Sequence, residues 1–114
     1  MEKQIMFKNI IIVVAVTLCA LFTNEHVVYS ANLEHGEQIF SANCAACHAG
    51  GNNVIMPEKT LKAEALEANN IKNISAIANQ VKNGKNAMPS FSRLSDSDIE
   101  DVANYVLSKA DKGW

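Results

Sequence analysis

The sequence has few of the residues that metal sites and disulfide scaffolds need. It contains three cysteines and three histidines in 114 residues, and neither type occurs after His48. A structural zinc site needs four ligands, and the chain beyond His48 supplies none from Cys or His. Cys19 lies in an apolar N-terminal run, which leaves only Cys44 and Cys47 for the rest of the chain. Two cysteines exclude a disulfide-rich scaffold.

Other patterns are missing as well. No basic run and no interleaving of basic with aromatic residues occurs, so nucleic-acid binding is unsupported. The segment 31–114 holds eight of the ten Lys/Arg and ten of the twelve Asp/Glu, a net charge of −2. It has no alternating run long enough for a strand, no internal repeat and no low-complexity linker. We therefore expect one small all-α domain.

The N-terminal segment reads as an export signal. Lys3 and Lys8 precede thirteen residues, 10–22, that include no charge. At 1.5 Å per residue this run spans about 20 Å of helix, whereas a bilayer core of roughly 30 Å needs about twenty residues. The run therefore suits the h-region of a signal peptide better than an uncleaved membrane anchor, which is the alternative.

The expected cleavage follows Ser30 and releases a domain of residues 31–114. This position places Val28 and Ser30 at −3 and −1, where slim or small residues are preferred. Cleavage after Ala31 would leave the bulky Tyr29 at −3 and is disfavoured.

The motif that carries chemistry is Cys44-Ala45-Ala46-Cys47-His48. It reads C-x-x-C-H, the attachment sequence for a c-type haem. The two thiols would add across the vinyl groups of one haem, and the imidazole of His48 would bind its iron. A thioredoxin-type redox pair should lie near a strand–helix–strand pattern, and none is visible. A plain disulfide between Cys44 and Cys47 would close too small a loop to stabilise much.

Two methionines could be the sixth iron ligand, and each is followed by proline: Met56 and Met88. Met56 lies only eight residues after His48 and would have to cross the haem plane almost at once. Met88 lies forty residues on, past two expected helices, so the chain can reach the other face. An imidazole and a thioether fill both axial positions, which favours electron transfer over catalysis. A small peroxidase would require Met88 to leave the iron.

Apolar periodicity predicts four helices. One carries a core face from Leu33 into the motif, a second spans 61–68, a third spans 74–83, and a fourth follows Ser95 with apolar residues through Leu107. Asn73 and Ser95 are expected N-caps, and Gly84 is expected to end the third helix.

Some finer expectations concern single residues. Gly36 predicts a close approach of the last helix, with Tyr105 packing on Gly36 and Phe40. His35 reads as a solvated surface residue, and Trp114 has no assigned role. The second imidazole nitrogen of His48 should donate to a backbone carbonyl in the loop 49–57, because metal-bound histidines usually have such a partner.

Over essentially the whole domain 31–114, the sequence resembles the cytochrome c6 family, and most closely its red-algal plastid forms. The resemblance rests on the C-x-x-C-H motif, the loop 50–61, the stretch 80–85, Ala87-Met88-Pro89, Arg93-Leu94-Ser95 and the helical segment 103–106. It implies a class I cytochrome c fold, with four helices wrapped around one covalent haem c. It also implies a soluble carrier, expected to be monomeric, that takes electrons from cytochrome f of the b6f complex to photosystem I in the thylakoid lumen.

The resemblance further implies roles for two residues. Gln80 would lie near the haem and tune its potential, and Arg93 would help to dock photosystem I. The family pattern has one more small residue between Phe91 and Arg93 than this chain has, which bears on the reach of Arg93. The residues alone also allow a bacterial periplasmic cytochrome that donates electrons to a terminal oxidase. Neither interpretation makes the protein an enzyme.

Overall fold

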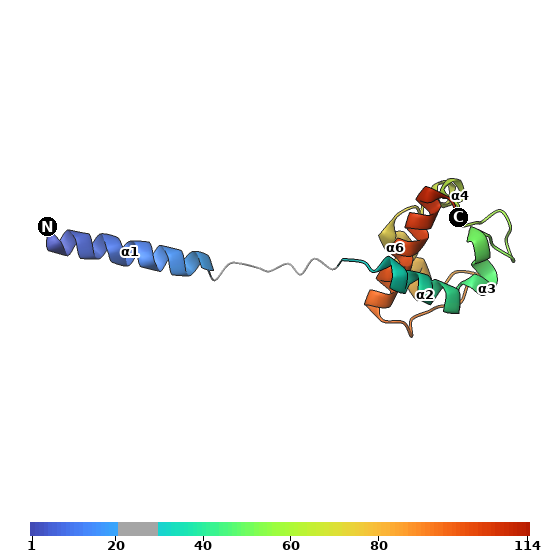
Figure 1. Cartoon of the computed structure of the whole chain (residues 1–114), viewed down its shortest axis with the longest axis horizontal. Coiled ribbons are helices and arrows are strands. Elements are labelled where there is room, and N and C mark those ends of the chain that lie inside the picture. The colour runs from blue at the N-terminus through green and yellow to red at the C-terminus, as the bar shows by residue number, and fades with distance from the viewer. Residues whose placement is uncertain (21–29) are drawn as a thin grey trace.

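The computed structural model describes residues 1–20 and 30–114, and every regular element within them is helical (Figure 1). The only pairing of strand type in these residues is an isolated bridge between Lys85 and Met88. The expected all-α class is therefore confirmed. The elements in chain order are α1 (Glu2–Ala20), α2 (Leu33–Asn43), α3 (Ala45–His48), the single 3₁₀ turn η1 (Ala49–Gly51), α4 (Ala63–Ala68), α5 (Ile74–Asn83) and α6 (Asp96–Lys112).

Helix α1 contains residues 10–20 of the apolar N-terminal run, and its residues up to 15 are exposed. Its Ile10, Ile11 and Ile12 side chains are 56%, 64% and 58% exposed. None of the described helices combines the length and the apolar character that a membrane span requires. The expected cleavage after Ser30 depends on Val28 and Tyr29, which lie outside the described residues.

The predicted ends of α5 and the predicted start of α6 are confirmed, whereas the predicted start at 61 is wrong, because α4 begins at Ala63. Asn73 accepts a hydrogen bond from the Ala76 N–H at 2.8 Å and begins α5. Gly84, with φ of 70°, ends it. Ser95 and Asp98 form a capping box at the start of α6, in which each side chain accepts from the other residue's backbone N–H. These local contacts set the length of the two helices that flank the Met88 loop.

Helices α2 and α6 pack against each other, as Gly36 predicted (Figure 1). A Cβ at Gly36 would collide with the carbonyl oxygen of Asp101 and would stand 2.9 Å from Tyr105 Cβ. The rings of Phe40 and Tyr105 lie 5.4 Å apart. Only glycine leaves room for this crossing.

The expected single helix from Leu33 into the motif is wrong in two respects. The chain bends at Cys44, whose φ of −117° separates α2 from α3. The Asn43 side chain donates to the Ile39 carbonyl at 2.9 Å just before the bend, and such local bonds compete with helix continuation. Leu33 is 43% exposed, and Ile39 is buried instead.

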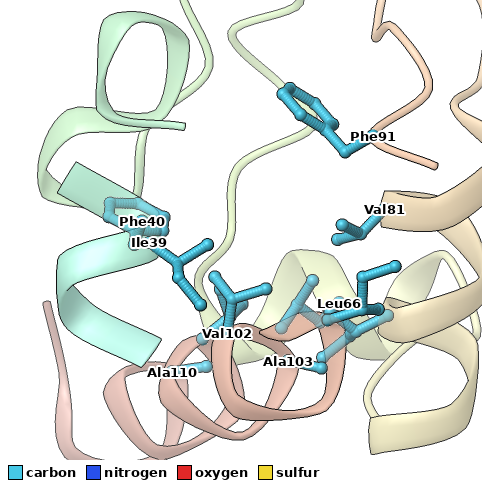
Figure 2. Close-up of a cluster of buried hydrophobic side chains, with 11 residues drawn as sticks. Ile39, Phe40, Leu66, Val81, Phe91, Val102, Ala103 and Ala110 are labelled. Atoms are coloured by element: carbon cyan, nitrogen blue, oxygen red, sulfur yellow. The ribbon is translucent and has the colours of Figure 1, made fainter. Parts of the chain in front are cut away.

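The core lies where α2, α4, α5 and α6 meet, and Figure 2 shows its side chains. Leu66 of α4 and Val102 and Ala103 of α6 are at most 1% exposed. Phe91 joins them from the loop between α5 and α6. This core forms one wall of the cavity that is lined by Phe40, Leu66 and Phe91.

Candidate haem site

A large apolar cavity opens beside the core. Its volume is about 220 Å³, and it is open to solvent at its mouth. Figure 2 shows Phe40 on one side of it and Val81 with Phe91 on the other. Its apolar lining comprises Phe40, Leu61, Leu66, Ile71, Ile77, Val81, Phe91, Val102 and Val106. The cavity therefore suits a large apolar group.

Both motif cysteines line this cavity as free thiols. The bend at Cys44 places it at the end of α2 and the start of α3, and its carbonyl accepts from the N–H groups of Cys47 and His48 at 3.1 and 2.9 Å. Burial, and secondly the nearby Cys47, raise the pKa of the Cys44 thiol from 9.0 to about 11. A raised pKa keeps Cys44 in the thiol form, whereas the attacking cysteine of a thiol–disulfide oxidoreductase needs a lowered pKa, so Cys44 does not suit that role.

The His48 imidazole also lines the cavity, and its ring is oriented by the chain. Its Nδ1 lies 2.8 Å from the carbonyl oxygen of Asn52. Because a carbonyl can only accept, Nδ1 carries the proton and Nε2 keeps its lone pair for a metal. The expected acceptor in the loop 49–57 is thus the Asn52 carbonyl.

Two glycines bring Asn52 back toward His48. Gly50 and Gly51 both have positive φ, of 63° and 74°, which a residue with a Cβ adopts only with strain. The Leu61 N–H then donates to the Gly51 carbonyl at 2.7 Å and closes the segment 51–61 into a loop. Within it, the Asn53 side chain accepts from Met56 N–H and donates to the Lys59 carbonyl.

Met88 lies half-buried on a short, tightly bonded loop and lines the same cavity. Its backbone exchanges two hydrogen bonds of 3.0 Å with Lys85. Gly84 permits the turn, since a Cβ there would come within 2.6 Å of the Met88 carbonyl oxygen. The Gln80 side-chain N–H donates to the Met88 sulfur at 3.7 Å. The two residues that the sequence singled out separately are therefore in contact.

Met56 lines the cavity as well. It is half-buried, and its backbone N–H donates to the Asn53 side chain at 2.9 Å. Because both methionines line the cavity, this position alone does not decide which of them is the sixth ligand. The hydrogen bond from Gln80 distinguishes Met88.

Arg93 lies at the edge of the cavity. Its guanidinium donates to the Asn43 side chain at 2.9 Å and stands 5.1 Å from the centre of the Phe91 ring. Asn43 and Phe91 both line the cavity. Arg93 itself is exposed, so its charge is presented beside the cavity.

Trp114, for which the sequence predicted no role, packs against the loop that follows His48. Its indole N–H donates to the Leu61 carbonyl at 2.9 Å, and its ring lies 5.3 Å from that of Phe40. A Cβ at Gly51 would collide with the indole. Phe40 and Gly51 were the only sequence features that could have indicated this contact. Nothing in the local sequence around either residue connects it to Trp114.

His35 is not simply solvated, as the sequence suggested. Its Nδ1 lies 2.8 Å from Oδ2 of Asp101, which is only 2% exposed. The Asn32 N–H donates to the other Asp101 oxygen at 2.8 Å. A buried carboxylate needs such partners, so His35 and Asn32 stabilise the joint between α2 and α6, away from the cavity lining.

The residues that face the cavity fit a c-type haem. They provide two thiols three residues apart, an imidazole with Nε2 available, two thioethers and a mainly apolar wall. In the part of the chain that the structure describes, no three His, Cys, Asp or Glu side chains gather into another kind of metal site.

Known proteins with similar sequences agree with this fit. A family model described as cytochrome c oxidase, cbb3-type, subunit III, matches residues 31–106. Cytochrome c6 of Cyanidioschyzon merolae is 78% identical over 87 residues, which cover 76% of this chain and 84% of that protein. Cytochrome c6 of Gracilaria tenuistipitata var. liui is 63% identical over 99 residues, covering 85% and 92%.

A solved structure gives the same result for the fold. Cytochrome c6 of the diatom Phaeodactylum tricornutum superposes with a TM-score of 0.72 at 57% identity, over 74% of this chain and all of that one. The expected class I cytochrome c fold is therefore confirmed.

Proposed function

The chain belongs to the cytochrome c6 family, and we propose that it carries single electrons from cytochrome f of the b6f complex to photosystem I. Membership of this family makes it a haem-containing electron carrier. Such a carrier is not normally counted as an enzyme. The two partners and the direction of transfer are the proposal.

In this proposal Cys44 and Cys47 would hold one haem c per chain through thioether bonds, and His48 and Met88 would be the ligands of its iron. Haem c supplies a one-electron Fe(III)/Fe(II) couple. The Asn52 carbonyl holds the proton of His48 on Nδ1 and so presents Nε2. Gln80 holds the Met88 side chain by its sulfur and tunes the potential.

The observation that carries the proposal is the pair of oriented ligands. His48 ends α3 and Met88 lies on the loop after α5, far away in sequence. Both line one cavity, and each has a hydrogen-bond partner on its ligand side chain. Two protein ligands leave the iron no open position for peroxide or oxygen, so the site favours electron transfer over catalysis.

The proposal places the domain 31–114 in the thylakoid lumen as a soluble monomer, after removal of residues 1–30. The algal origin of the relatives and the apolar run in α1 support this. Arg93 contributes to docking with photosystem I, which its exposed position beside the cavity mouth supports.

The test begins with the optical spectrum of the purified domain 31–114, made with its haem. A covalently held haem and the ferric Fe–S charge-transfer band are expected, and their absence contradicts the ligand set. The ferrous protein is then added to flash-oxidised photosystem I, whose re-reduction should accelerate. Turnover by a bacterial terminal oxidase, measured in parallel, provides the comparison. Rapid oxidase turnover without any effect on photosystem I would favour the periplasmic alternative.

A further inference from the structure

We infer that Trp114, the last residue, is a positioning residue for His48, acting through the loop 51–61. This inference rests on the proposed function, because it concerns the imidazole assigned to the iron. Trp114 itself is absent from the cavity lining, so it acts through the backbone of that loop.

The loop has a neck, which is formed by Gly51 and Leu61. The Leu61 N–H donates to the Gly51 carbonyl at 2.7 Å. Asn52, whose carbonyl holds the His48 ring, is the first residue after the neck. The angle at which the neck is held therefore sets the direction of the hydrogen bond to His48.

Trp114 contacts both sides of this neck. On one side its indole N–H donates to the Leu61 carbonyl at 2.9 Å. On the other its ring covers Gly51 so closely that a Cβ there would overlap the indole. Gly51, the last residue of η1, is itself buried. The Trp114 side chain thus holds the two sides of the neck, Gly51 and Leu61, together from outside the cavity.

The indole in turn is held by the scaffold. Gly113, with φ of 89°, ends α6 and turns the chain back. The rings of Phe40 and Tyr105 lie 5.3 and 6.2 Å from that of Trp114, and Lys109 Nζ stands 5.9 Å from its centre. The crossing of α2 and α6 thereby fixes the position of the loop that orients His48.

The test uses the haem-containing domain 31–114 with Trp114→Phe, which keeps an aromatic ring and removes the indole donor. Loss of one net hydrogen bond predicts about fivefold faster amide exchange at Leu61. Exchange at Val102 in α6 should stay unchanged, because that amide lies in the helix core. The reduction potential should rise, because a His48 with a weaker Nδ1–H bond is a poorer donor to iron. Lys112→Ala, an exposed change in the same last turn, is the control and should alter neither quantity.

Equal acceleration at Leu61 and Val102 would mean that Trp114 only stabilises the whole fold, and this result overturns the inference. Unchanged exchange at Leu61 overturns it as well. Amide exchange reports on the loop and not on the iron, so a failure of the inference at Leu61 can be told from a failure of the proposed function. A wild-type protein without haem would contradict the proposed function alone.

Discussion

Replacing Gly36 by alanine tests whether the crossing of α2 and α6 is as tight as the structure shows. In an exposed helix interior, Gly→Ala stabilises by about 1 kcal/mol. At Gly36 the new Cβ would overlap the Asp101 carbonyl oxygen and approach Tyr105 Cβ to 2.9 Å. A backbone carbonyl cannot rotate away as a flexible side chain can, so the two helices must separate.

The expected result is a net loss of stability. Overpacking costs about 1–3 kcal/mol, and the gain in helix propensity offsets about 1 kcal/mol of it. We expect the upper part of the overpacking range, because backbone is involved, and hence a net loss of about 1–2 kcal/mol. For a domain of this size, each kcal/mol corresponds to a decrease in Tm of about 4–8 °C.

The assay is urea unfolding of the haem-containing domain 31–114, followed by far-ultraviolet circular dichroism. Gln38→Ala, on the exposed face of α2, is the matched control and should stay within about 0.5 kcal/mol of wild type. A Gly36→Ala variant as stable as wild type, or more stable, would refute the close approach. The Fe–S band should persist, because the crossing lies away from Met88.

Three further outcomes are expected. Met88→Ala should lower the reduction potential and open the iron to small ligands such as carbon monoxide, whereas Met56→Ala should change neither property. Spectra in which Met56→Ala, and not Met88→Ala, binds carbon monoxide would show that the ligand assignment is wrong. Gln80→Leu should lower the reduction potential while keeping the Fe–S band, because it removes an N–H that polarises the Met88 sulfur. That N–H favours the ferrous state. Potentiometric titration measures the potential, and an unchanged value contradicts the tuning role. The Lys82 ammonium lies 2.8 Å from Oδ1 of Asp96 and holds the pKa of that carboxyl below 3.8. The pair therefore stabilises the fold above pH 3.8, and this stabilisation is lost as the pH falls through the folded-state pKa. Asp96→Asn should therefore be slightly less stable than wild type at pH 7, and a difference in urea midpoint that does not shrink below pH 3.8 would contradict this linkage.

Helix ends were predictable from the sequence because their signals are local. Asn73 and Ser95 accept hydrogen bonds from N–H groups three residues on, so the cap and its partner lie within one turn. Gly84 ends α5 through its own backbone conformation. The same locality explains the error at Cys44, where the apolar spacing continued but the side chain of Asn43 favoured a bend.

The contacts that orient the site were less predictable, since they join distant parts of the chain. The sequence predicted that a carbonyl between 49 and 57 would accept from His48, but only the fold of Gly50 and Gly51 selects Asn52. The contact of Gln80 with the Met88 sulfur requires α5 and the following loop to fold back on each other. Neither follows from spacing alone.

The sequence by itself determined the chemistry of this protein: the C-x-x-C-H motif, two candidate thioethers, an apolar leader and a helical pattern that resembles one family. Those features depend on residue type and on spacings of a few residues, so they can be read without coordinates. Only the tertiary structure decided how the ligands are held. Trp114 meets the Leu61 carbonyl across 53 residues, and the buried Asp101 meets His35 across 66. Contacts of such span form when packing of the whole core brings the elements together, and no local pattern specifies them.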